Sequence, residues 1–278
     1  MKSVLKTVTV SCSFMMLLGA VFMPAVARLK VDAVSLHAVN HLQQGKVKVR
    51  RGDYKGAIAD FTQEIQINPK STEAYISRGL AHHDLEDFKK AIADFNQALI
   101  LEPRNDQALY RRGEARTDTE DFLGAFSDIN QAIQINPRYA EAYNHRAMLY
   151  GEFKGDLKRA LSDLNQAIQL KPTYADAYYN RGKALSDLGK YRGAVADYTR
   201  AIALNPDLAE AYGSRGSLRA QLGEKKAGLQ DLQQAASIFS QQNNPMGYQQ
   251  TLMLIQQIQQ LPNPNVMRGS RGVKVIVP

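Results

Sequence analysis

The chain has 278 residues, of which 44% are hydrophobic and 22% charged, a balance that fits a globular protein and excludes a disordered one. The net charge of +8 lies mainly at the two ends, because residues 38–242 hold 28 of the 35 basic residues and 26 of the 27 acidic ones. A nucleic-acid surface needs clustered basic residues, so no nucleic-acid partner is expected.

The N-terminal segment has the layout of a secretory signal peptide. Two lysines, Lys2 and Lys6, precede an apolar run over residues 8–23, and Pro24 is followed by Ala25-Val26-Ala27. Residues 1–27 are therefore predicted to be a signal peptide cleaved after Ala27, with export to the periplasm, an equivalent lumen or the medium. Removal of Cys12, the single cysteine, would leave no thiol for disulfides, nucleophilic catalysis or zinc binding. The alternative is an uncleaved membrane anchor of about 20 residues.

After a lead-in over residues 28–37, the sequence repeats itself. Prolines end helical patterns at spacings of 34, 34, 35 and 34 residues, at Pro69, Pro103, Pro137, Pro172 and Pro206. A period of this length indicates a stack of similar units. Aligned on the prolines, residues 38–242 form six repeats, 38–71, 72–105, 106–139, 140–174, 175–208 and 209–242.

Each repeat is predicted to hold two helices. The first carries a large residue followed four positions later by glycine or alanine. The second carries an alanine and, four residues on, a bulky side chain. Small residues opposite large ones let two antiparallel helices interlock, so the small positions are interpreted as contacts between helix backbones. They are Gly45, Gly79, Gly113, Ala147, Gly182 and Gly216.

With segments such as "AEAYNHRAMLY" and "ALSDLNQAIQLKP", the chain resembles the tetratricopeptide-repeat family over about 205 of its residues. The resemblance implies an all-α fold, a right-handed α-solenoid of six helix-turn-helix repeats whose first helices line a concave groove. The end repeats depart from the pattern, with His41 in the aromatic position of the first and Gly228 for alanine in the last. Atypical end repeats are expected where a stack meets solvent.

An arginine and an aspartate recur 16 or 17 residues apart, which places them on the two antiparallel helices of one repeat. We interpret them as a ladder of partly buried structural ion pairs and not as a phosphate-binding row. The pairs are Arg78–Asp94, Arg112–Asp128, Arg146–Asp163, Arg181–Asp197 and Arg215–Asp231, and Asp60 holds the aspartate position of the first repeat.

The resemblance also implies which residues line the groove, since ligand contacts in this family come from outward positions of the first helices. Tyrosines there would supply contact area, and asparagines hydrogen bonds to a peptide backbone. Glu114 and Met148 do not fit the family's clamp for a terminal carboxylate. The candidate peptide-binding residues are Tyr110, Arg111, Glu114, Asn144, His145, Met148, Tyr179, Asn180 and Lys183.

The C-terminal region is predicted to form a capping helix over 243–261, with apolar residues at helical spacing, and a flexible basic tail over 262–278. The tail contains three basic residues and no acid.

The sequence contains no phosphate-binding loop and no nucleophile motif. His82-His83-Asp84 and the pair His37 and His41 give too few ligands for a zinc site. The sequence therefore predicts no enzyme, no cofactor and no metal.

The predicted function is a scaffold or assembly factor that binds a protein or peptide in its groove outside the cytoplasm. One alternative is a membrane-anchored factor in the assembly of a membrane complex. Another is a weak binder of nucleic acid or anionic surfaces through Lys46–Lys55 and the tail.

Overall fold

The structure is a computed structural model that describes residues 41–260. The signal peptide or anchor, the lead-in, His37 and the basic tail lie outside the described residues. Within residues 41–260 the chain is helical with no strand, and none of these helices is long and apolar enough to cross a membrane. The chain divides into two compact parts, Met1–Glu102 and Pro103–Pro278, which are described separately.

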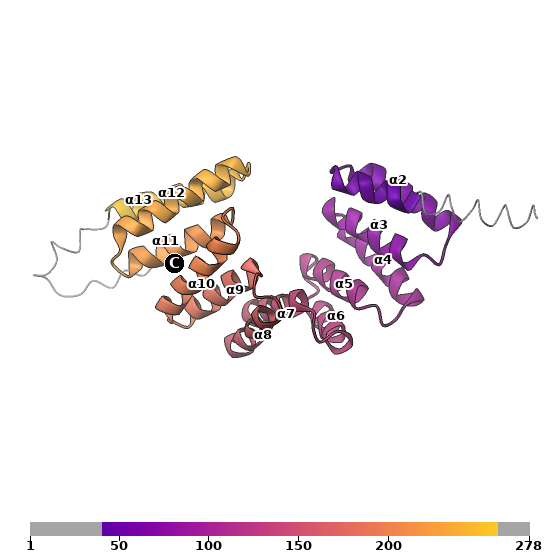
Figure 1. The fold of residues 1–278 in the computed structure, drawn as a ribbon, viewed down its shortest axis with the longest axis horizontal. Coiled ribbons are helices and arrows are strands. Elements are labelled where there is room, and N and C mark those ends of the chain that lie inside the picture. Colours follow the sequence, from indigo (N-terminus) through magenta and orange to yellow (C-terminus); the bar gives the residue numbers. More distant parts are fainter. Residues whose placement is uncertain (1–40, 261–278) are drawn as a thin grey trace, which may run out of the picture. The chain divides into compact units, whose positions relative to one another are not determined.

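In the first part, a helix over residues 41–50 precedes α2 (Tyr54–Ile67), α3 (Thr72–Asp84) and α4 (Phe88–Leu101). The second part contains eight further paired helices and a final one (Figure 1). They are α5 (Asp106–Asp118), α6 (Phe122–Ile135), α7 (Ala140–Glu152), α8 (Leu157–Leu170), α9 (Ala175–Asp187), α10 (Tyr191–Leu204), α11 (Ala209–Gln221), α12 (Lys225–Gln241) and α13 (Pro245–Gln260). Within each part every helix packs against the next one in sequence.

Local signals explain where the helices begin and turn. The second helices of repeats 1 to 4 begin after an aspartate whose side chain accepts a hydrogen bond from a backbone N–H of the first turn; these are Asp53, Asp87, Asp121 and Asp156. The residue just before each of them has a positive φ, for example +76° at Gly52 and +64° at Gly155. Glycine adopts this conformation without steric cost, and in repeats 2 and 3 the residues that adopt it are Glu86 and Glu120.

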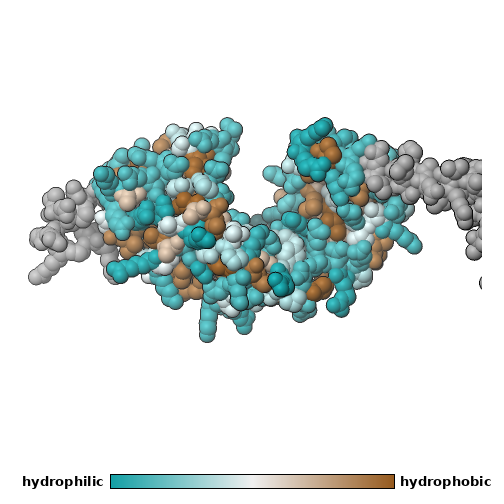
Figure 2. Space-filling model, in the orientation of Figure 1, coloured by the Kyte–Doolittle hydropathy of each residue, from teal (hydrophilic) through white to brown (hydrophobic). Residues whose placement is uncertain are grey.

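The core consists of alanines on one helix and large side chains on its partner. Ala57, Ala91 and Ala125 are fully buried, and so are Phe95 and Ile129. A Cβ atom added to Gly79 would lie 2.7 Å from the ring of Phe95, so the glycine makes the room that the ring occupies. On the face shown in Figure 2, hydrophobic side chains are interspersed with hydrophilic ones.

The repeated arginine connects three helices. Arg146 donates from Nε and Nη2 to the two carboxylate oxygens of Asp163 at 2.7 and 2.8 Å, and from Nη1 to Asn130 Oδ1, in the preceding repeat, at 2.8 Å. Its guanidinium also lies 5.4 Å from the ring centre of Tyr143. The same fork joins Arg78–Asp94, Arg112–Asp128, Arg181–Asp197 and Arg215–Asp231.

The bond to the preceding repeat recurs as well. Arg78 reaches Thr62, Arg181 reaches Asn165, and Arg215 reaches Thr199. A forked guanidinium has donors left over after it binds a carboxylate. The arginine therefore fixes the stacking of consecutive repeats as well as the pairing of helices within one. In the first repeat, Asp60 is instead paired with Lys48 at 2.8 Å.

The C-terminal helix is slightly shorter than predicted. α12 continues to Gln241, and α13 begins at Pro245, where the missing N–H of proline costs nothing. Asn244 Oδ1 accepts a hydrogen bond from the N–H of Gly247 at 2.9 Å. The ring of Phe239 and the helix residue Tyr248 pack in the same cluster, so α13 covers the end of the last repeat.

Candidate functional site

The first helices of the repeats in the second part follow one another as neighbours, since α7 contacts α9 and α11 contacts α13. Polar side chains connect them from repeat to repeat. His145 lies 2.9 Å from the hydroxyl of Thr117 on α5, and Asn180 donates to Asn144 at 3.0 Å. Lys183 pairs with Glu152 at 2.7 Å. The candidate residues predicted on α5, α7 and α9 thus lie on one continuous helix row.

Two of the predicted contact residues are not presented outward. Tyr110 and Asn144 are each 6% exposed. The ring of Tyr110 packs against Tyr139 at 4.8 Å between centroids, and Asn144 donates to the hydroxyl of Tyr174 at 3.4 Å. Their polar and aromatic groups hold the repeats together, so the expectation that they offer free contact to a ligand does not match the geometry.

Tyr139 and Tyr174, which pack on Tyr110 and Asn144, were not predicted from the sequence. A tyrosine at the N-cap position of a helix was the signal that could have identified them. They stand just before α7 and α9, where the equivalent Ser71 and Asn105 cap their helices with a side-chain hydrogen bond. A tyrosine there forgoes a cap that typically contributes about 1 kcal/mol. Burial raises the pKa of both phenols.

Glu114 is half-buried and paired with Arg111 at 2.8 Å. Tyr179 is half-buried against the ring of Tyr198. Met148, by contrast, is 37% exposed. Among the predicted residues, the outward part of the helix row is therefore formed by Met148, Lys183 and Arg111, whose side chain is 37% exposed, while Asn180 is half-buried.

His145 lies in a confined and acidic environment. The Thr117 hydroxyl donates to the carbonyl of Gly113 at 3.0 Å and lies 2.9 Å from Nε2 of His145. Burial lowers the pKa of His145, although the carboxylates of Glu114, Asp118 and Glu152 act in the opposite direction. The imidazole is accordingly neutral at pH 7.

We expect His145→Gln to make the fold less sensitive to mild acid. A histidine whose folded pKa is below the unfolded value of about 6.5 stabilises the fold above that pH. This contribution is lost as the pH falls through 6.5 towards the folded pKa, because the unfolded chain takes up the proton first. Urea unfolding at pH 7.5 and pH 5 measures the effect, and an equal loss of stability in parent and variant would contradict it.

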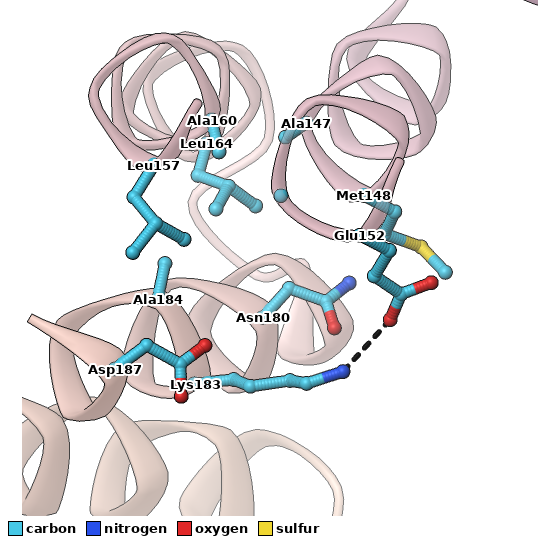
Figure 3. Close-up of a pocket in the computed structure, with 11 residues that line it drawn as sticks. Ala147, Met148, Glu152, Leu157, Ala160, Leu164, Asn180, Lys183, Ala184 and Asp187 are labelled. Atoms are coloured by element: carbon cyan, nitrogen blue, oxygen red, sulfur yellow. Dashed lines mark hydrogen bonds and ion pairs between the residues drawn. The ribbon is translucent and has the colours of Figure 1, made fainter. Parts of the chain in front are cut away.

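A pocket of about 240 Å³ opens between α7, α8 and α9. Its walls are apolar, and Leu157 and Leu164 of α8 point into it opposite Ala184 of α9 (Figure 3). The remaining lining residues are Ala147, Met148, Gly151, Glu152, Ala160, Asn180, Lys183 and Asp187.

The pocket exists because repeat 4 lacks two rings. Leu157 stands where repeats 1, 2, 3 and 5 have Tyr54, Phe88, Phe122 and Tyr191. Leu164 stands where repeats 1, 2 and 5 have Phe61, Phe95 and Tyr198. A leucine fills less volume than an aromatic ring, and protein interiors are otherwise packed without large voids. Gly151 adds space, since a Cβ placed there would still lie 3.9 Å from Leu157.

The rim of the pocket is polar. Asn180, Lys183 and Asp187 come from α9, Met148 and Glu152 come from α7, and the Lys183–Glu152 ion pair joins the two helices (Figure 3). The pairing with Glu152 raises the pKa of Lys183, so its ammonium stays charged. An apolar floor with a few polar groups at the rim is the usual design of a site that accepts a ligand's apolar group and orients what is attached to it.

In the basic cluster Lys46–Lys55, Lys46 and Lys48 pair with Glu73 and Asp60, while Arg50, Arg51 and Lys55 are exposed. Among residues 41–260 no group of three His, Cys, Asp or Glu side chains is placed to hold a metal ion.

The fold and the helix row define a protein of stacked helix pairs. Models of the tetratricopeptide repeat match residues 72–105 and 175–208, and a model described as TPR repeat matches 154–187. These matches, together with the fold, show that the chain contains tetratricopeptide repeats. A comparison with curated proteins gives no match.

Solved structures of the same architecture are similar to this chain. MamA is 25% identical, with 60% of this chain and 96% of MamA covered at a TM-score of 0.51. PilF of Pseudomonas aeruginosa is 17% identical, with 80% and 99% covered at 0.63. YrrB, described as a TPR protein with an unusual peptide-binding site, is 20% identical, with 72% and 98% covered at 0.52. At these identities PilF and YrrB show the fold alone.

Proposed function

We propose that this protein is a non-enzymatic scaffold or assembly factor that binds an extended peptide segment of a partner along the row of first helices in its second part. The observation that carries the proposal is the apolar pocket between α7, α8 and α9, which opens on that row. An apolar side chain of the partner enters the pocket between Leu157, Leu164 and Ala184.

The rim suits a peptide in particular. Asn180 carries an amide with both a donor and an acceptor, as a peptide backbone requires. Lys183 and Asp187 offer one charge of each sign beside the opening. A buried apolar anchor surrounded by polar groups is how a small number of residues supplies most of the affinity of a protein interface.

The layout of residues 1–27 supports a place of action outside the cytoplasm, in the periplasm or an equivalent lumen. Expression of a C-terminally tagged chain tests this. A soluble product whose mass corresponds to a start at Arg28 is expected. A product that keeps Met1 in the membrane fraction would instead support the anchored alternative, in which the protein assembles membrane complexes.

We expect Leu157→Phe to abolish peptide binding without loss of stability. The ring would occupy the pocket, and four other repeats already carry an aromatic residue at this position. Peptides selected from a random library on the parent are measured by fluorescence anisotropy against both proteins, and a loss of affinity of at least tenfold is expected.

The control is Leu123→Phe, on α6, whose side chain is 71% exposed and lies away from the pocket. Its affinity should equal that of the parent. Equal binding to Leu157→Phe, with unfolding curves that coincide, would contradict the proposal.

A further inference from the structure

The surroundings of the pocket are acidic although the chain as a whole is basic. Glu152 and Asp187 lie at the rim, and Glu114 and Asp118 lie with Glu152 around the neighbouring His145. Two cations, Arg111 and Lys183, are paired with Glu114 and Glu152. Among the residues that line the pocket, two carboxylates, Glu152 and Asp187, and one cation, Lys183, leave a net charge of −1, within a protein of net charge +8.

A segment of the same chain has the complementary composition. Residues 262–278 read PNPNVMRGSRGVKVIVP, with three basic residues and no acidic one. Apolar residues stand directly next to the cations, as Met267 beside Arg268 and Val273 beside Lys274. A ligand for this pocket needs that combination, an apolar side chain for the floor and an adjacent cation for the acidic rim.

The end of α13 lies on the same side of the helix pairs as the pocket opening. Lys225, the first residue of α12, donates to the carbonyl of Gln259 at 2.9 Å, so the end of α13 lies beside the turn of repeat 6. Gly151 and Leu157 flank the turn of repeat 4, and Asp187 ends α9 next to the turn of repeat 5. The pocket and the departure point of the tail are therefore on the same side of the helix pairs.

The length of the segment also suffices. First helices succeed one another in the order α9, α11, α13, and packed helices are about 8–10 Å apart, so the span is roughly 20 Å. The thirteen residues that follow Gln260, up to Val273, reach roughly 43 Å when extended, at about 3.3 Å each. A connection within one molecule is thus sterically allowed.

We propose that the basic C-terminal segment, residues 262–278, is an intramolecular ligand of the pocket between α7, α8 and α9. This inference rests on the proposed function, because it places a peptide segment of the chain itself in the pocket proposed to bind partner peptides. An apolar side chain of the segment enters the pocket while its cations lie against Glu152 and Asp187. An outside peptide then competes with the segment, so the segment sets the affinity for partners.

Disulfide trapping in the full chain tests the placement. With Cys12 replaced by serine, Met148→Cys at the rim is combined with Val273→Cys in the segment, and mild oxidation is followed by mass spectrometry. A monomeric crosslinked product is expected whose yield does not change on tenfold dilution. The matched control pairs Leu123→Cys, on the exposed face of α6, with Val273→Cys and should give at least tenfold less product.

Two changes should abolish the trapped product, namely Leu157→Phe and reversal of the three charges by Arg268→Glu, Arg271→Glu and Lys274→Glu. Charge reversal should also raise the affinity for a library-selected peptide at least threefold, because the competing segment is released. A product that is only dimeric, or a yield equal to the control, would overturn the proposal.

The outcomes separate the two proposals. If no intramolecular product forms but Leu157→Phe still abolishes binding of selected peptides, the intramolecular ligand is wrong and the peptide-binding function stands. If Leu157→Phe affects neither the trapping nor the selected peptides, both proposals fail.

Discussion

Replacement of Asp128 by asparagine is expected to lower the free energy of unfolding by about 3 kcal/mol. Its side chain is 1% exposed and receives three charged donors, from Arg112 Nε and Nη2 at 2.8 and 2.6 Å and from Arg116 Nη1 at 2.7 Å. Asparagine has nearly the same shape but no charge, and its amide nitrogen cannot accept from a guanidinium.

The size of the effect follows from what remains after the change. Two guanidiniums would stay close together without their carboxylate, and breaking a buried pair costs about 3–5 kcal/mol. Arg112 and Arg116 are 17% and 24% exposed, so water screens part of this cost and the lower end of the range applies.

Urea unfolding measures the change, with Asp60→Asn as the control at the same position of repeat 1. Asp60 is paired with a lysine that is 37% exposed, and such pairs contribute about 0–1 kcal/mol. Equal losses for Asp60→Asn and Asp128→Asn would show that the arginine fork adds nothing to the position.

The substitution Gly228→Ala is expected to destabilise the protein by about 1 kcal/mol, although helix propensity and the other repeats both favour alanine at this position. Alanine stabilises a helix interior by about 1 kcal/mol relative to glycine, and repeats 1 to 5 have alanine here. In repeat 6, however, a Cβ on Gly228 would lie 2.5 Å from the carbonyl oxygen of Gly216 and 2.9 Å from the backbone nitrogen of Ala220.

Those neighbours are backbone atoms of α11 and cannot turn away as a side chain would. α12 must move outward, and overpacking of this kind costs about 1–3 kcal/mol. The control is Gly213→Ala on α11, where the added Cβ would find its nearest neighbour at 4.0 Å. It should raise stability by up to about 1 kcal/mol. If thermal unfolding shows both alanine variants more stable than the parent, the close approach of α11 and α12 is wrong.

Regularities within one helix pair could be predicted from the sequence. The 34-residue period predicted a stack of similar units, the resemblance to tetratricopeptide repeats implied the all-α fold, and the spacing of 16 or 17 residues placed the arginines opposite the aspartates. These features depend on helix periodicity, which relates sequence distance directly to position on a helix face. The third bond of the arginine, to Thr62, Asn130, Asn165 or Thr199, was not predicted, because it depends on how one repeat stacks on the next.

The candidate site was predicted only in part. Met148, Asn180 and Lys183 do lie at the pocket, while Tyr110 and Asn144 are buried under Tyr139 and Tyr174. A position on the outward side of a helix does not determine exposure, because a neighbouring repeat can cover it. Tyr139 and Tyr174 stand in the connections between repeats, at the position where repeats 2 and 3 have Ser71 and Asn105, so the residues that the repeats share did not indicate them.

By itself the sequence determined the family, the pairing of helices and the ladder of Arg–Asp ion pairs, because the residues responsible recur at a fixed spacing along the chain. Only the tertiary structure decided where the stack has a pocket. A void depends on the summed volumes of side chains from three helices, and Leu157, Leu164 and Gly151 look unremarkable until α7, α8 and α9 are packed together.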